Sequence, residues 1–242
     1  MANRLALITG AERGIGKETA RQLVERGFSV VIAGYDMVAA QSTVDELSAV
    51  GEVRSVRMDV ADDQSIDDAF EDIGSASPTI DVLVNNAGTV ARGSAIDVTR
   101  EQLRVIFDVN VFGAAMVTRA ALPFLRRSAH PRIVNLSSGG GSLTRTTDFA
   151  KTGSAGAPIL AYAASKCALN MITVQTHLVL QSDPLLRHIK INSASPGTTA
   201  TQISGFQGQS VSDGARIVVH LATIDDAGPS GGYFELDGPV EW

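Results

Sequence analysis

Short apolar segments alternate with longer amphipathic segments along the whole chain of 242 residues. The apolar segments have the length of β-strands, and several are nearly continuous, which is typical of parallel strands covered on both faces. They span residues 5–9, 29–33, 53–58, 82–85, 132–136, 189–194 and 233–236. Because strands that alternate with helices are joined by right-handed crossovers, this order predicts a doubly wound parallel sheet of about seven strands in a three-layer α/β/α arrangement.

The segments between these strands carry helix signals. An apolar stripe after the first strand is ended by Gly27, and Asp62 is placed to cap a helix that follows it. Longer helical patterns cover residues 99–127 and 162–182, and a shorter one covers residues 212–224. We find no internal linker and no repeat, so the pattern predicts a single domain over the 242 residues.

Composition narrows the class of protein. The formal net charge of −6 disfavours nucleic acid or an anionic membrane as a partner. Cys167 is the single cysteine, which excludes an intramolecular disulfide and is expected to be a buried small hydrophobe. No apolar run approaches the roughly 18 residues of a membrane span, and the start leaves no room for a signal peptide. We therefore expect a cytoplasmic protein with no nucleic-acid and no membrane partner.

The first predicted strand runs into a glycine-rich turn. Residues 9–16 read TGAERGIG and place Gly10, Gly14 and Gly16 directly before a predicted helix. Glycines allow a tight turn, close approach of a pyrophosphate and close packing of the helix on the strand, and a helix N-terminus favours phosphate. In this strand–turn–helix context, the glycines predict a Rossmann-type fold that binds a dinucleotide.

Further motifs follow this turn in a fixed order. NNAG stands at 85–88, Asn110 lies within VNV, Ser138 follows the fifth predicted strand, YAASK spans 162–166 and SPG spans 195–197. Together with the TGxxxGxG spacing and the terminal GGYFELDGP, this set resembles the short-chain dehydrogenase/reductase superfamily over essentially the whole chain. Within it, the sequence most resembles a carbonyl-reductase-like branch. The resemblance implies an NAD(P)-dependent oxidoreductase that acts on carbonyl or alcohol groups.

The same resemblance implies which residues contact the nicotinamide dinucleotide. They are Gly10, Arg13, Gly14, Ile15, Gly16, Tyr35, Asp59, Val60, Asn86, Ala87, Gly88, Tyr162, Lys166, Pro196, Gly197, Thr198 and Thr201. Asp59 matches an aspartate that contacts the adenine, and the backbone of Val60 lies beside it. The alternative for Asp59 is a turn residue that only starts the next helix.

Four positions bear on the choice between NADP(H) and NAD(H). Relatives that prefer NAD(H) carry a carboxylate at the position of Gly34, where it binds the ribose hydroxyls. Arg13 matches a basic residue of NADP-dependent relatives and is suited to a 2′-phosphate. The nearby Asp36 weakens the case for NADP(H), and Tyr35 stands where many of those relatives carry arginine. The alternative for Arg13 is a solvated arginine on an exposed turn. The pattern favours NADP(H) and leaves NAD(H) possible.

The chemistry depends on a tyrosine with a lysine one helical turn later. Hydride transfer to a carbonyl needs a proton donor, and a tyrosine with its ordinary pKa of about 10 is a poor acid or base at neutral pH. Lys166 lies on the same helix face as Tyr162, so its charge, with that of the oxidised nicotinamide, is expected to lower the tyrosine pKa. The resemblance makes Tyr162 the proton donor, and Lys166 also the ligand of the nicotinamide ribose. It assigns Ser138 to the substrate carbonyl and Asn110 to a water-linked proton relay.

The four histidines have neither metal-ligand spacing nor a place in this set, so we expect no metal. They are His130, His177, His188 and His220. We expect these histidines to be structural or exposed.

Two segments depart from the family pattern. Residues 139–160 form an insertion between Ser138 and Tyr162 that is longer than in most relatives. It is expected to line the substrate cleft, to cover a helix face that relatives use for assembly, or both. The segment 198–214 is shorter than the lid of many relatives, which suggests an open cleft.

The leading hypothesis is an NADPH-dependent reductase of aldehydes or ketones. An alcohol dehydrogenase or a natural-product tailoring ketoreductase is the alternative among enzymes. A nucleotide-binding regulator without catalysis is the alternative of another class, and the intact set of four catalytic positions argues against it. The expected partner is a small carbonyl or alcohol substrate. Substrate identity and assembly as a monomer, dimer or tetramer are left open.

Overall fold

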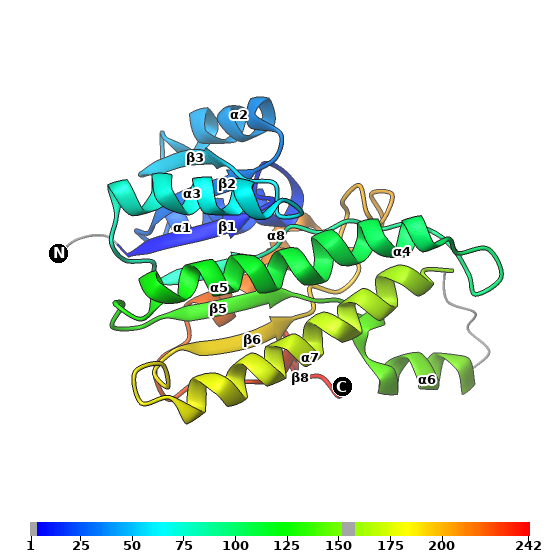
Figure 1. Cartoon of the computed structure of the whole chain (residues 1–242). Helices are drawn as coiled ribbons and strands as arrows, with labels where there is room; N and C mark the ends of the chain where they lie inside the picture. Colours follow the sequence, from blue (N-terminus) through cyan, green and yellow to red (C-terminus); the bar gives the residue numbers. More distant parts are fainter. Residues whose placement is uncertain (1–3, 152–157) are drawn as a thin grey trace.

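The computed structural model describes residues 4–151 and 158–242 and contains one eight-stranded sheet in the order β3-β2-β1-β4-β5-β6-β7-β8 (Figure 1). Its strands are β1 Leu5–Thr9, β2 Ser29–Gly34, β3 Val53–Arg57, β4 Val82–Asn85, β5 Arg132–Leu136, β6 Lys190–Ala194, β7 Tyr233–Glu235 and β8 Gly238–Pro239. The first seven strands pair in parallel, and only β7 and β8 pair antiparallel. The predicted doubly wound parallel sheet is confirmed, and the eighth strand is an addition of two residues.

Helices cover both faces of this sheet. They are α1 Gly14–Val24, α2 Met37–Leu47, α3 Asp63–Ala76, α4 Arg100–Phe107, a π-helix Asp108–Gly113, α5 Ala114–Leu125, a 3-10 turn Gly139–Gly141, α6 Leu143–Lys151, α7 Leu160–Ser182 and α8 Val211–Ala222. Helices α1, α2 and α8 pack in one hydrophobic core, and α3, α5 and α7 pack in the other. The second set lies in front of the sheet in Figure 1. This arrangement is the expected three-layer α/β/α fold.

Side chains of the central strands alternate between the two cores. In β1, Ala6 and Ile8 belong to the core with α1 and α8, whereas Leu7 belongs to the core with α3 and α5. In β4, Val84 and Leu83 divide in the same way. Because neighbouring residues of a strand point to opposite faces, a strand buried on both faces needs an unbroken apolar run. This is why the predicted strand segments were nearly continuous in apolar residues.

Helices α4 and α5 continue through the π-helix as one helical stretch, Arg100–Leu125. Its most apolar 18-residue window has a mean hydropathy of 1.5, which by length and composition alone would allow it to cross a membrane. Val117, Ala121 and Leu125 on α5 are fully buried in the core against the sheet. We therefore identify this stretch as a core helix of the domain.

Local signals set several helix ends. The Asp62 side chain accepts a hydrogen bond from the backbone N–H of Gln64 at the start of α3, as predicted. Thr99 and Gln102 form a reciprocal capping box at the start of α4. On α7, Cys167 is half-buried rather than buried, which corrects the expectation from sequence.

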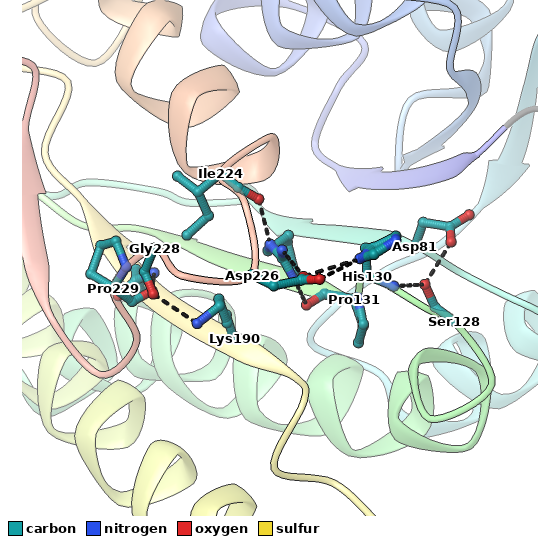
Figure 2. A network of polar contacts seen from close by, with 11 residues as sticks. Asp81, Ser128, His130, Pro131, Lys190, Ile224, Asp226, Gly228 and Pro229 are labelled. Atoms are coloured by element: carbon teal, nitrogen blue, oxygen red, sulfur yellow. Dashed lines mark hydrogen bonds and ion pairs between the residues drawn. The ribbon is translucent and has the colours of Figure 1, made fainter.

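A polar network holds the amino-terminal ends of β5 and β6 to the loop between α8 and β7 (Figure 2). The guanidinium of the buried Arg132 donates to Asp226 at 2.7 Å, and the imidazole of His130 contacts the same carboxylate at 2.9 Å. Hydrogen bonds from Arg132 and His130 hold the pKa of Asp226 at about 2. Lys190 donates to the carbonyl of Gly228 at 2.7 Å. These contacts give His130 a structural role at the end of the sheet opposite the strand carboxyl ends.

The strand order reverses at β1, whose neighbours are β2 on one side and β4 on the other. At such a switch point, the loops after the two strands diverge to opposite faces and leave a crevice at the carboxyl ends of the strands. The glycine-rich turn follows β1 and the NNAG segment follows β4, so both motifs meet at this crevice.

Candidate active site

The glycine-rich turn is packed against the NNAG segment. Gly10 has a φ of +61°, and a Cβ atom there would lie 2.9 Å from the Cα of Ala87. A Cβ atom at Gly16 would collide with the Asn86 amide and the Gly10 carbonyl. The Asn86 side chain donates to the carbonyls of Thr9 and Gly10, both at 2.8 Å. Glycine is required at these positions because the two loops share one space.

The start of α1 offers backbone donors to an anion. Its N-cap residue, Arg13, is extended and makes no side-chain cap hydrogen bond. The first amides of a helix have no intrahelical acceptor, and the helix dipole adds positive potential there. Gly14 has a φ of +56°, and a Cβ atom there would lie 3.5 Å from the Cγ2 of Thr201 on the opposite wall. A narrow cradle that ends in free helix amides fits the pyrophosphate of a dinucleotide.

A cavity of about 950 Å³ adjoins the turn at the carboxyl ends of the strands. It brings together predicted residues from five separate parts of the chain. Those that line it are Ile15, Asn86, Gly88, Ser138, Tyr162, Lys166, Pro196, Gly197, Thr198 and Thr201. Three of the four predicted catalytic side chains therefore face one space.

Tyr162 and Lys166 project from the first two turns of α7, and Ser138 lies just after β5. The Lys166 Nζ lies 5.6 Å from the centre of the Tyr162 ring and donates to the carbonyl of Leu136 at 2.8 Å. Burial raises the pKa of the Tyr162 phenol, and a hydrogen bond with Ser138 opposes part of this shift. Burial lowers the pKa of Lys166 to about 8.

The direction of the Tyr162 shift differs from the expectation that Lys166 lowers it. The reason is desolvation, because the phenolate would lose its water in this buried position. The predicted lowering also included the charge of an oxidised nicotinamide. In the chain alone, burial dominates, so Tyr162 holds its proton at neutral pH.

Asn110 lies in the π-helix between α4 and α5 and is buried. Its side-chain oxygen accepts from the Thr89 amide at 2.8 Å, and its Nδ2 donates to the Thr89 carbonyl at 2.9 Å and to the Ser165 hydroxyl at 3.0 Å. A Cβ atom at Gly88 would lie 3.4 Å from the Asn110 oxygen and 3.6 Å from the Lys166 Nζ. Asn110 therefore ties the segment after NNAG to α7, next to Lys166. Its role in a proton relay stays a prediction.

The remaining predicted residues do not line the cavity. They are Gly10, Arg13, Gly14, Gly16, Tyr35, Asp59, Val60, Ala87 and Asn110. Tyr35 is 65% exposed, and Arg13 is exposed and pairs with Asp36 at 3.3 Å. The Asp59 carboxylate accepts from the Ala61 amide at 3.0 Å, which fits the alternative of a turn residue before α3.

The insertion supplies part of the cavity wall that the motifs did not reveal. Arg145 and Thr146 on α6 and Ile159 just before α7 line the cavity. Gly93, which follows β4 in the chain, pairs with Ile159 in an isolated β-bridge. These residues place part of the insertion in the cavity wall, and its expected role at the substrate cleft stays a prediction. Residues 152–157 of the insertion lie outside those described.

The C-terminal part of the chain also reaches the site. Glu235 on β7 lines the cavity and forms an ion pair with Arg145 of the insertion. Its carboxylate also accepts from the hydroxyl of Ser195 at 2.8 Å. The buried Tyr233 donates to the backbone carbonyl of Ser138 at 2.6 Å. Because Tyr233 and Ser138 stand 95 positions apart, no local sequence pattern indicated this contact.

The glycine-rich turn lies at the switch point of a doubly wound sheet, beside a half-buried tyrosine and a buried lysine on one helix face. This combination defines an NAD(P)-dependent oxidoreductase of Rossmann type. Residues 4–211 match the sequence model of the family described as "short chain dehydrogenase". The chain belongs to this family, whose members act on carbonyl and alcohol groups.

Individual relatives agree with this assignment. The chain is 35% identical to the short-chain dehydrogenase anuI of Penicillium roqueforti, with 90% of this chain and 88% of that protein covered. It is 33% identical to the short-chain dehydrogenase/reductase tropE of Talaromyces stipitatus, with 98% of this chain and 97% of that protein covered. The fold matches a crystal structure of NADPH-bound carbonyl reductase from chicken fatty liver with a TM-score of 0.87 at 23% identity, over the whole of both chains.

Proposed function

We propose that this protein is an NADPH-dependent reductase of aldehydes or ketones and that Tyr162 is its general acid. The observation that carries this proposal is the convergence of Ser138, Tyr162 and Lys166 on one cavity beside the glycine-rich turn. The bound nicotinamide would supply the hydride. The single-domain organisation over the 242 residues, the placement in a carbonyl-reductase-like branch and action in the cytoplasm belong to the same proposal.

Each of the three side chains has a task that its surroundings favour. Ser138 is placed to hydrogen-bond the substrate carbonyl oxygen, since it already bonds Tyr162. Tyr162 keeps its proton at neutral pH because burial raises its pKa, so the phenol carries the proton that the developing alkoxide takes up. The raised pKa makes the phenol a weaker acid, but an alkoxide is a strong enough base to accept its proton. Lys166 has a pKa of about 8, so its amine can hold or release a proton near neutrality and can renew the proton of Tyr162.

The finer proposal on the cofactor is a preference for NADPH over NADH. Gly34 itself supplies no carboxylate at the end of β2, and Arg13 stands at the turn where it can approach a 2′-phosphate. The pairing of Arg13 with Asp36 reduces the charge available for this contact. Initial rates with each cofactor measure the preference, and a clear advantage for NADH would contradict it.

The same site can run in the oxidative direction, because the groups that protonate an alkoxide also deprotonate an alcohol. An alcohol dehydrogenase or a tailoring ketoreductase would use the same three residues. The half-buried Tyr162 next to the buried Lys166 favours these activities over a regulator without catalysis, because a regulator has no need of this pair.

The test is oxidation of NADPH by the purified protein with a panel of aldehydes, ketones, diketones, quinones and enones. We expect turnover with at least one class, and Tyr162→Phe to reduce it by at least about 10²-fold. Cofactor affinity, measured by fluorescence titration, should be largely preserved in this variant. Its thermal midpoint serves as the control for folding.

Activity in Tyr162→Phe close to that of the original protein would refute the role of this residue. Tight NADPH binding without turnover on any carbonyl or alcohol would instead favour the regulator. Ser138→Ala provides a second test, since it removes the proposed carbonyl donor and leaves the phenol in place.

A further inference from the structure

The side chain of Glu12 fills the place that a side chain at position 34 would take. Glu12 lies in the glycine-rich turn, and Gly34 ends β2. A Cβ atom on Gly34 would lie 3.0 Å from the Oε2 and 3.4 Å from the Cδ of Glu12. The backbone carbonyl of Glu12 accepts from the Thr43 hydroxyl at 3.1 Å, which fixes the turn against α2. A carboxylate therefore stands at the end of β2 although that strand ends in glycine.

This carboxylate is not satisfied within the described part of the chain. The Glu12 side chain is 11% exposed, and its Oε2 is buried without a hydrogen-bond partner there. Its Oε1 lies 3.9 Å from the guanidinium of Arg13. A buried carboxylate oxygen without a donor is costly, and such groups in native proteins commonly mark a ligand or functional site. An ionised carboxylate only accepts hydrogen bonds, so the complementary ligand group is a donor such as a hydroxyl.

The position of this carboxylate indicates which ligand group it meets. In dinucleotide-binding folds, an acidic residue about 20 residues beyond the glycine-rich turn binds the ribose 2′-hydroxyl. Gly34 stands 20 positions after Gly14 and has no side chain to do so. We propose that Glu12 takes this role from within the turn, binds the hydroxyls of the adenosine ribose, and limits the preference for NADP(H). This inference rests on the proposed dinucleotide site.

The charges at this end of the crevice act in opposite directions. Arg13 attracts a 2′-phosphate, whereas Glu12 and Asp36 repel it, and Asp36 also pairs with Arg13 at 3.3 Å. The three groups together carry one formal negative charge. A ribose with free hydroxyls gives donors to Glu12, but a 2′-phosphate places like charge beside it. Glu12 therefore narrows the advantage that Arg13 gives to NADP(H).

The test measures binding of two fragments that lack nicotinamide, ADP-ribose and 2′-phospho-ADP-ribose, by isothermal titration calorimetry. The quantity compared is the ratio of the affinity for 2′-phospho-ADP-ribose to the affinity for ADP-ribose. We expect Glu12→Gln to raise this ratio by about tenfold, because one like charge is removed beside the phosphate. Glu12→Ser should move the ratio in the same direction. Glu25→Gln removes the same charge at the far end of α1 and should leave the ratio unchanged.

A ratio of affinities that stays within about twofold in both Glu12 variants, while both fragments still bind, would overturn the inference. So would an equal loss of affinity for the two fragments, since that indicates a role only in folding of the turn. The calorimetric test measures binding without turnover, so it does not depend on the proposed reductase activity. A failure of that activity is detected separately, with the panel of carbonyl substrates. A protein that binds neither fragment would contradict both the dinucleotide site and the role of Glu12.

Discussion

Replacement of Lys166 by methionine tests the electrostatics of the site directly. Lys166 is 4% exposed, and its amine donates one hydrogen bond, to the carbonyl of Leu136. Burial lowers its pKa from 10.5 to about 8, which corresponds to about 3 kcal/mol of destabilisation while the amine is charged. Loss of the hydrogen bond would cost about 1 kcal/mol. We therefore expect Lys166→Met to stabilise the cofactor-free protein at pH 7 by about 2 kcal/mol and to abolish turnover.

The sign of the pH dependence follows from the same shift. Below pH 8, Lys166 is protonated in the folded and the unfolded protein, so the cost of its charge is constant. Between pH 8 and 10.5, the unfolded chain still binds the proton and the folded protein has released it, so stability rises with pH. From pH 7 to about 9.5 the expected rise is about 2 kcal/mol in the original protein, and Lys166→Met should lack it.

Urea denaturation, followed by far-ultraviolet circular dichroism at several pH values, measures both effects. Lys190→Met is the matched control, because it also removes a lysine that donates to a backbone carbonyl. Lys190 begins β6, so it lies at the opposite end of the strands from the cavity. The Lys190→Met variant should keep the rise in stability above pH 8. Two results together would refute the destabilising effect of the Lys166 charge. One is a Lys166→Met variant that is less stable than the original protein at pH 7, and the other is a free energy of unfolding of the original protein that does not rise between pH 7 and about 9.5.

Two further predictions concern Tyr233 and Phe206, which lie near the cavity in sequence but do not line it. Tyr233→Phe removes the hydroxyl that donates to the Ser138 carbonyl, so we expect the free energy of unfolding, measured by urea denaturation, to fall by about 1–3 kcal/mol. We also expect a lower kcat with little change in KM. An unchanged kcat would contradict a role of Tyr233 in positioning Ser138. Phe206 has a φ of +61° and is exposed, and Phe206→Asn should raise stability by about 1 kcal/mol because asparagine tolerates this conformation better. A lower thermal midpoint in Phe206→Asn would show that the phenyl group makes a stabilising contact.

The sheet was predictable because its central strands are buried on both faces. In β4 the buried residues Val82–Val84 must all be apolar, and the bounds of this strand, Val82–Asn85, agree with those expected from sequence. The glycine-rich turn was predictable for a different reason. Gly10 and Gly16 have no room for a Cβ atom against the NNAG segment, so the sequence must carry glycine at both positions. Where backbone geometry or burial restricts the residue type, the restriction is visible in one sequence.

The parts that escaped prediction depend on contacts between distant segments. The strand Gly238–Pro239 is two residues long and has no alternation to detect. The helix Leu143–Lys151 lies in a polar insertion that appeared irregular in sequence. The carboxylate of Glu12 reaches the end of β2 only after folding, and the Tyr162 pKa depends on a degree of burial that spacing does not encode.

The proposed catalytic residues and the cavity walls therefore follow different physical rules. Tyr162 and Lys166 are held on one helix face, and their proposed chemistry requires that spacing. The walls come from the insertion, through Arg145, and from β7, through Glu235, and these two segments are joined by an ion pair across the cavity rim. A change in either segment alters the cavity without replacing Tyr162, the proposed proton donor. Under the proposed function, the cavity walls can therefore change while the reaction is retained, because Arg145 and Glu235 carry none of the proposed proton chemistry.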